Sequence, residues 1–93
     1  MNATEYRGRN GEAMSYRCPA PGSANPIWGT DVYTDDSSVC TAAVHAGVIT
    51  LETGGSVMIR VREGVGNYPG TTQNGVTSQA WDRMWDGSFE LVR

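Results

Sequence analysis

The segment from Tyr33 to His45 constrains the fold of this chain more than any other part of its sequence. It reads as the end of a strand, then an Asp/Ser cap, then a short helix with almost no polar side. A helix that is apolar nearly all round must be covered on every side. Its apolar residues are nearly all small, so neighbouring backbone can approach it closely: Val39, Cys40, Ala42, Ala43, Val44 and Ala46. The segment therefore predicts a central helix wrapped by strands.

Capping signals bound this helix at both ends. Asp36, Ser37 or Ser38 can accept hydrogen bonds from the free N–H groups of its first turn. Gly47 follows the last helical residue, which is typical of a left-handed C-terminal cap. The helix is therefore expected to begin after Ser38 and to end before Gly47.

Short segments in which apolar and polar residues alternate predict the strands. The segments are Thr4–Arg7, Ala13–Cys18, Ile27–Tyr33 (interrupted by Gly29), Val48–Leu51, Ser56–Glu63 and Ser88–Val92. Asn10-Gly11 predicts a tight turn that pairs the first two as a hairpin, and Asn74-Gly75 predicts a second tight turn. Three prolines make the segment from Pro19 to Pro26 a surface loop. The pattern indicates an α+β fold of mostly antiparallel strands and one helix.

Length and charge exclude several classes of protein. The 93 residues suit a single domain, expected to span residues 1–93. The net charge of −3 offers no basic patch for a nucleic acid, and no apolar run approaches the ~20 residues of a membrane span. The N-terminus lacks a signal peptide, so we expect an excised domain or a mature form with an added Met.

The two cysteines, Cys18 and Cys40, leave two interpretations open. A disulfide between them would stabilise the fold by about 3 kcal/mol and would imply an oxidising compartment. Two separate buried thiols are the alternative. With one histidine and no CxxC pair, neither interpretation includes a zinc site.

Two pairs of residues are candidates for ligand binding. Arg60 and Arg62 share one face of the clearest strand, at a spacing of roughly 6.5 to 7 Å that suits two anionic groups of a glycan. The alternative is a solvated face paired with Glu52 or Glu90. Trp81 and Trp85 would share a face on a helical turn, as a sugar or protein contact or as packing.

Nothing in the sequence predicts catalysis, a metal or a cofactor. His45 would lie at the helix end opposite to the Asp and Ser residues, so we expect it to anchor a loop. Asp31, Asp35 and Asp36 lack the pattern of a calcium loop, and capping accounts for Asp36. Gly64-Val-Gly66 is not followed by a helix, which makes a nucleotide site a weak hypothesis.

Three segments together resemble the LCCL domain, the module named after factor C, cochlin and a lung gestation protein. They are Ile27–Val48, Gly54-Gly55 with the strand Val57–Val61, and the run Asn67-Tyr-Pro-Gly-Thr-Thr-Gln-Asn-Gly-Val-Thr-Ser78. The resemblance extends from about residue 6 to residue 92, which we expect to be the domain core. Thr71 stands where the family more often has Ser. The cysteines of the second bridge of animal members are absent, so the chain looks more like the bacterial single-domain members.

The resemblance implies a central helix between antiparallel sheets, a Cys18–Cys40 disulfide and a secreted, extracellular or periplasmic location. It implies no enzymatic activity. A role in binding lipopolysaccharide or another anionic glycan is the expected function, and a structural or protein–protein interaction module appended to a larger protein is the alternative. Asp36, Ser38, His45, Gly47, Asn74 and Gly75 are expected to be structural.

Overall fold

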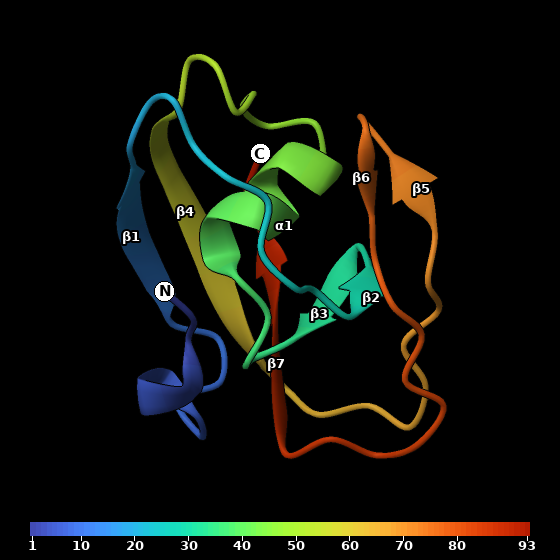
Figure 1. Cartoon of the computed structure of the whole chain (residues 1–93). Helices are drawn as coiled ribbons and strands as arrows, with labels where there is room; N and C mark the ends of the chain where they lie inside the picture. The colour runs from blue at the N-terminus through green and yellow to red at the C-terminus, as the bar shows by residue number, and fades with distance from the viewer.

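The computed structural model describes residues 1–93 and places one helix, α1 (Val39–His45), in the middle of the molecule (Figure 1). The strands are β1 (Ala13–Cys18), β2 (Gly29–Thr30), β3 (Val32–Thr34), β4 (Gly55–Glu63), β5 (Thr72–Gln73), β6 (Val76–Thr77) and β7 (Gly87–Leu91). They form an antiparallel five-stranded sheet in the order β1-β4-β7-β3-β2 and a separate β5-β6 hairpin. The predicted α+β architecture, with a short helix between antiparallel sheets, is confirmed.

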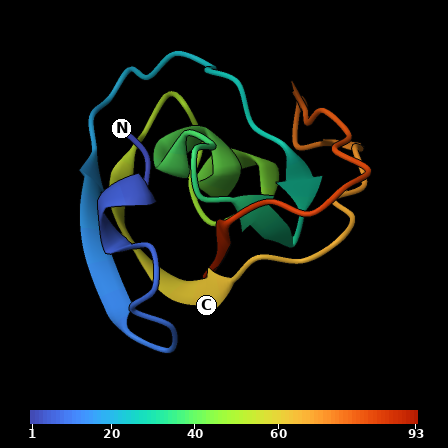
Figure 2. The ribbon, with the colours of Figure 1, turned by 90° about the horizontal axis from the view of Figure 1, so that it is seen from below.

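The helix is enclosed, as its small apolar residues predict. Val39, Ala42 and Ala43 have no exposed surface, and Val44 keeps 5% of its surface. When the molecule is seen from below, strands and loops surround α1 (Figure 2). Because the helix packs on all sides, its buried residues join those of β1, β4 and β7 in one hydrophobic core.

The two helix ends use local hydrogen bonds. Ser38 is the N-cap, and its Oγ accepts a hydrogen bond from the Thr41 N–H at 3.2 Å. Asp36 does not cap the helix, because it lies two residues before the N-cap. At the other end Gly47 has φ +82°, and the N–H groups of Gly47 and Val48 donate to the carbonyls of Val44 and Ala43. This is a Schellman motif, and its left-handed residue suits glycine.

The strand β4 organises the large sheet. It pairs with β1 on one side, where Ala13 faces Arg60, and with β7 on the other, where Glu90 faces Arg60. Its apolar residues Val57, Ile59 and Val61 are buried while the alternate residues point outward. The predicted strands 13–18, 56–63 and 88–92 are therefore confirmed within a residue or two.

The predicted N-terminal hairpin is wrong. Residues 4–6 form a 3₁₀ turn, η1 (Thr4–Tyr6), and β1 pairs with β4 instead. The Asn10-Gly11 turn docks on β4, because the Gly11 N–H donates to the Val61 carbonyl at 2.7 Å. Ala3 is also buried in the core, and its N–H donates to the Asp35 carbonyl. Tertiary packing thus overrides the short alternation of residues 4–7.

Two other predicted strands also differ from the structure. The segment 27–33 is not one strand, because Asp31 at φ +68° reverses the chain between β2 and β3. Residues 48–51 form no strand; they lead through turns into β4. The Asn74-Gly75 turn is confirmed: both residues have positive φ and they join β5 to β6 in a two-residue hairpin loop.

Candidate functional site

The outer face of the large sheet, directed away from α1, carries three arginines. Arg60 and Arg62 project from β4 and Arg17 projects from β1. Arg17 pairs with Ser56 across the strands, so it lies about 13 Å along the sheet from the Ala13–Arg60 pair. The residues between them are small or unbranched: Ala13, Ser15, Ser56 and Met58. The result is a sheet surface with positive charge and few bulky side chains, which we call the arginine face (Arg17, Met58, Arg60, Arg62).

Each arginine of this face is already oriented by a neighbour. The Arg62 Nη1 lies 3.0 Å from the Glu90 carboxylate, so the predicted alternative partner Glu90 is indeed in contact with it. The Arg60 Nη1 donates to the Gly11 carbonyl at 2.7 Å, and Arg17 donates to the Ser56 hydroxyl at 3.4 Å. Glu52 pairs with neither arginine. Arg60 and Arg17 therefore keep charge that no carboxylate neutralises.

Trp81 and Trp85 lie together, but not on a helical turn. Both belong to the irregular segment before β7, and their ring centroids are 5.8 Å apart with planes at 89°. Backbone hydrogen bonds between Trp81 and Tyr68 hold the segment in place. Both indoles are half-buried. The pair therefore combines packing with an accessible surface.

His45 is a buried structural residue. Its Nδ1 is hydrogen-bonded to the Tyr33 hydroxyl at 2.8 Å, and its Nε2 lies 3.1 Å from the Thr71 carbonyl oxygen. No carboxylate or serine contacts the imidazole, and the ring has no exposed surface. The loop before β5 is thus fastened to the helix, and Asn74 adds a hydrogen bond to the His45 carbonyl at 2.9 Å. The sequence alone does not predict this contact between Asn74 and His45.

Asp35, a buried residue, forms an ion pair with Arg7 that the sequence does not predict. The residue is 2% exposed, and its carboxylate accepts two hydrogen bonds from the Arg7 guanidinium and one from the Trp85 indole, each at 2.8 Å. Burial by itself would raise the pKa of Asp35, but the hydrogen bonds from Arg7 and Trp85 outweigh it and lower that pKa below its usual value. The carboxylate ties the N-terminal segment to the segment before β7.

We expect the Arg7–Asp35 pair to make the free energy of unfolding fall in acid. The folded-state pKa of Asp35 is lowered, so its stabilisation is present above the ordinary pKa of about 4 and is lost as the pH falls through the lower folded value. Asp35→Asn should cost about 2 kcal/mol of unfolding free energy at pH 7, and this difference should shrink towards pH 3. Urea titrations at both pH values measure it.

The exposed pair Arg9–Glu12 offers a matched control. Glu12→Gln removes a carboxylate that also bonds an arginine at 2.8 Å, but both side chains face water. It should leave the free energy of unfolding unchanged at either pH. If Asp35→Asn lowered the free energy of unfolding equally at both pH values, the charge of Asp35 would not be what stabilises the fold.

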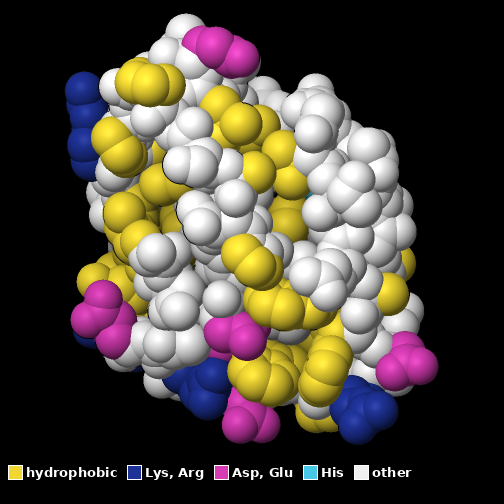
Figure 3. Space-filling view, in the orientation of Figure 1, with side chains coloured by type: hydrophobic (Ala, Val, Ile, Leu, Met, Phe, Trp, Pro, Cys, Tyr) yellow, Lys and Arg dark blue, Asp and Glu magenta, His cyan; other side chains and the backbone are white.

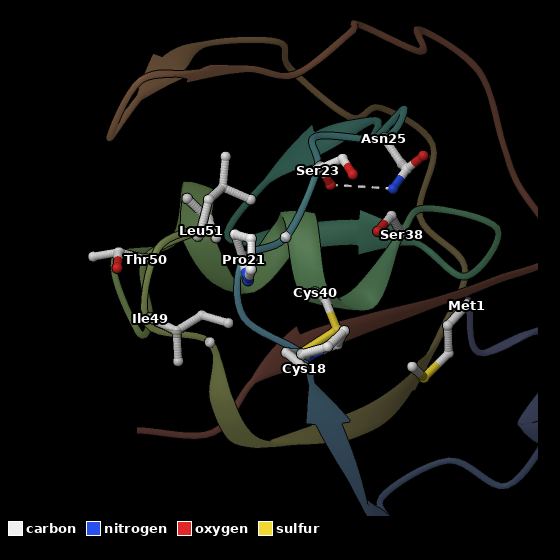
Figure 4. Close-up of a pocket in the computed structure, with 14 residues that line it drawn as sticks. Met1, Cys18, Pro21, Ser23, Asn25, Ser38, Cys40, Ile49, Thr50 and Leu51 are labelled. Carbon is white, nitrogen blue, oxygen red and sulfur yellow. Dashed lines mark hydrogen bonds between the residues drawn. A yellow bond between two sulfur atoms is a disulfide. The ribbon is translucent and has the colours of Figure 1, made fainter.

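Two hollows flank the helix on the face opposite to the arginines. One, of about 260 Å³, lies beside the Cys18–Cys40 disulfide under the proline-rich loop (Figure 4). The other, of about 610 Å³, is open and runs between the segment 47–53 and the β6 end of the hairpin (Figure 3). Apolar side chains such as Val44 and Ile49 line both, and the one charged residue is Glu52. No arginine lines either hollow.

The chain has one disulfide and no cluster of side chains that could hold a metal ion. Cys18 and Cys40 are bonded, with Cα atoms 5.6 Å apart, so the disulfide interpretation is confirmed. No three His, Cys, Asp or Glu side chains are grouped closely enough to hold a metal ion. No helix has the length and apolar character that crossing a membrane requires.

Comparisons with known proteins agree on one family. The model of the LCCL domain matches residues 1–89. Human "Cysteine-rich secretory protein LCCL domain-containing 2" is 41% identical over 75 residues, which are 75% of this chain and 15% of that protein. Human vitrin is 45% identical over 79 residues, 82% of this chain and 11% of vitrin. Clotting factor C of Tachypleus tridentatus is 35% identical over 79 residues, 83% of this chain and 8% of that protein.

Proposed function

The chain belongs to the LCCL domain family, and on that premise we propose that it is a recognition module that binds an anionic glycan, such as lipopolysaccharide, through its arginine face. The observation that carries this proposal is that Arg17 of β1 and Arg60 and Arg62 of β4 share the outer face of the sheet, where Glu90 is the one carboxylate in an ion pair with them. Guanidinium groups bind phosphate and carboxylate with paired hydrogen bonds.

The domain is an extracellular or periplasmic, non-catalytic module. Its disulfide suits an oxidising compartment, and one of its relatives is named a secretory protein. The chain spans 15% or less of the length of the relatives reported above, so the likeness concerns this one domain of those proteins. We further propose that residues 1–93 fold as one domain with its core between about residues 6 and 92.

The contacts of the arginines support binding rather than pure packing. Arg62 is engaged by one carboxylate, and that contact is half-exposed on both sides, so an anionic ligand can compete for it at little cost. Arg60 is held by a neutral carbonyl, which orients the guanidinium without cancelling its charge. Both features leave the face ready to exchange a weak internal partner for an external one.

We expect Arg60→Ala/Arg62→Ala to weaken binding of lipopolysaccharide or heparin by about tenfold, because two charge-assisted contacts are lost. Glu90→Gln should act in the opposite sense and tighten binding, because it frees Arg62. Surface plasmon resonance at two salt concentrations measures both effects, and binding should weaken as salt is added.

Arg83→Ala is the control for the loss of an arginine elsewhere, and Arg62→Ala alone is the variant that matches it in charge, because Arg83 belongs to the segment before β7 and not to the sheet face. The Arg83→Ala variant is the one expected to bind like the wild type. Equal affinity of the wild type and the double variant would refute the arginine face as the binding site. Arg60→Lys/Arg62→Lys separates plain charge from paired hydrogen bonding, because lysine keeps only the former.

A structural or protein–protein interaction module is the second candidate, favoured by the small share of each relative that the domain makes up. It would act by docking against a neighbouring domain or a partner protein. A glycan array without a ligand, together with retention of a defined partner by the domain, would select this function over glycan binding.

A further inference from the structure

The three tryptophans of the chain meet in one pocket that the proposed glycan site does not use. The pocket, of about 180 Å³, is lined by Trp28, Thr34, Asp36, Trp81 and Trp85. On the face of the molecule that Figure 3 shows, apolar side chains gather at the lower end, with acidic and basic side chains around them. We propose that this tryptophan pocket binds a small organic cation, and that a quaternary ammonium group of the choline type is the chemistry that it fits.

The walls of the pocket suit a rounded cation better than a flat sugar ring. Trp81 and Trp85 stand at 89° to each other with centroids 5.8 Å apart, so they form a corner rather than a platform. A sugar stacks on one aromatic face, whereas an ammonium group is attracted to several indole faces at once. Trp28 supplies a third indole from another part of the chain.

The walls are also fixed in advance. The Trp85 indole N–H donates to the buried Asp35 carboxylate at 2.8 Å, which sets the rotation of that ring. Trp81 exchanges backbone hydrogen bonds of 2.7 and 2.9 Å with Tyr68, a fully buried residue. A ligand therefore does not have to order the Trp85 ring or the backbone that carries Trp81, and ordering is a main cost of binding.

Asp36 supplies the negative charge for a cation. Its side chain is half-buried, lines the pocket and takes part in none of the four ion pairs of the structure. Asp36 does not cap α1, contrary to the expectation from the sequence, because Ser38 is the N-cap. Arg7 acts on Asp36 only at longer range than an ion pair, so a cation that enters beside this half-buried carboxylate would be its first direct partner and would stabilise it.

The neighbouring arginines do not take this role. Arg83 lies over the Trp81 ring at 5.2 Å and Arg7 over the Trp85 ring at 5.8 Å, yet neither lines the pocket. The charge of Arg7 is met by Asp35 at 2.8 Å and by Asp86 at 3.5 Å. The two contacts show that these indoles accept cations, while the pocket and Asp36 stay open to another.

The test compares choline with 3,3-dimethyl-1-butanol, which has the same shape without the charge. Choline should quench tryptophan fluorescence in a saturable way and shift the indole N–H resonances, and the neutral analogue should bind at least about tenfold more weakly. Equal affinity for the two would overturn the proposal, and so would failure of choline to saturate. Saturable binding of a methyl glucoside without choline binding would assign the pocket to sugars instead.

Asp36→Asn isolates the charge, because it keeps the shape of the side chain. It should weaken choline binding by about tenfold while leaving thermal unfolding unchanged. Glu52→Gln, which changes the net charge equally but lies by the open hollow, should bind choline like the wild type. Wild-type affinity in Asp36→Asn would refute the carboxylate as the counter-charge. Because the arginine face is not involved, this result is independent of the glycan experiment.

Discussion

Cys18→Ala/Cys40→Ala should lower the free energy of unfolding by about 3 kcal/mol, because the disulfide restricts the unfolded chain between its two ends. For a domain of this size that corresponds to a fall in melting temperature of roughly 15 °C. The bond joins the end of β1 to the first turn of α1, so the helix loses its covalent link to the sheet as well. Urea titration followed by circular dichroism measures the change.

Reduction of the wild type with dithiothreitol provides the internal comparison. It removes the same constraint without changing core volume, so the two losses should agree within about 1 kcal/mol. The double variant should still fold at low temperature, because the helix caps and the core remain in place. A double variant as stable as the oxidised wild type would show that the disulfide constrains little of the unfolded chain.

Gly29→Ala should destabilise the domain by at least about 3 kcal/mol, because two costs act at the same residue. Gly29 has φ +107°, a conformation that side chains rarely adopt, and an added Cβ would overlap the carbonyl oxygen of Val32. The obstacle is backbone of the adjacent strand in the β2–β3 pair, so it cannot rotate away. Melting temperature and urea midpoint should both fall.

Gly66→Ala is the matched control, since Gly66 has no heavy atom within 4 Å of an added Cβ and no positive φ. Its stability should stay within about 0.5 kcal/mol of the wild type. If Gly29→Ala proved equally mild, the tight reversal between β2 and β3 would have to relax without cost, contrary to the packing of Tyr33 and Tyr68 against Gly29.

Local signals predict the elements whose causes lie nearby in the sequence. The helix follows from small apolar residues between Ser38 and Gly47, and β4 from strict alternation. The outward direction of Arg60 and Arg62 follows from the same alternation. The Asn74-Gly75 loop is predicted equally well, because a two-residue turn needs positive φ at both positions. In each case the signal and the structure occupy the same few residues.

The rest depends on contacts between distant residues. Residues 4–7 alternate like a strand, yet the buried Ala3 and the Arg7–Asp35 pair place them in a turn against the sheet. Trp28 joins Trp81 and Trp85 only because β2 lies next to the segment before β7, where Trp28 bridges Gln79. Arg17 alternates outward with Ser15, a signal present in the sequence, but its placement beside β4 requires the register of the sheet.

The seven residues of α1 are too few to remain helical in water by themselves. The helix therefore exists only while the strands and loops around it stay in place, and none of them can melt alone without uncovering it. The domain should consequently open as one cooperative unit, with no half-formed species in which the helix persists. In an extracellular setting such all-or-none behaviour limits the exposure of cleavable segments to proteases.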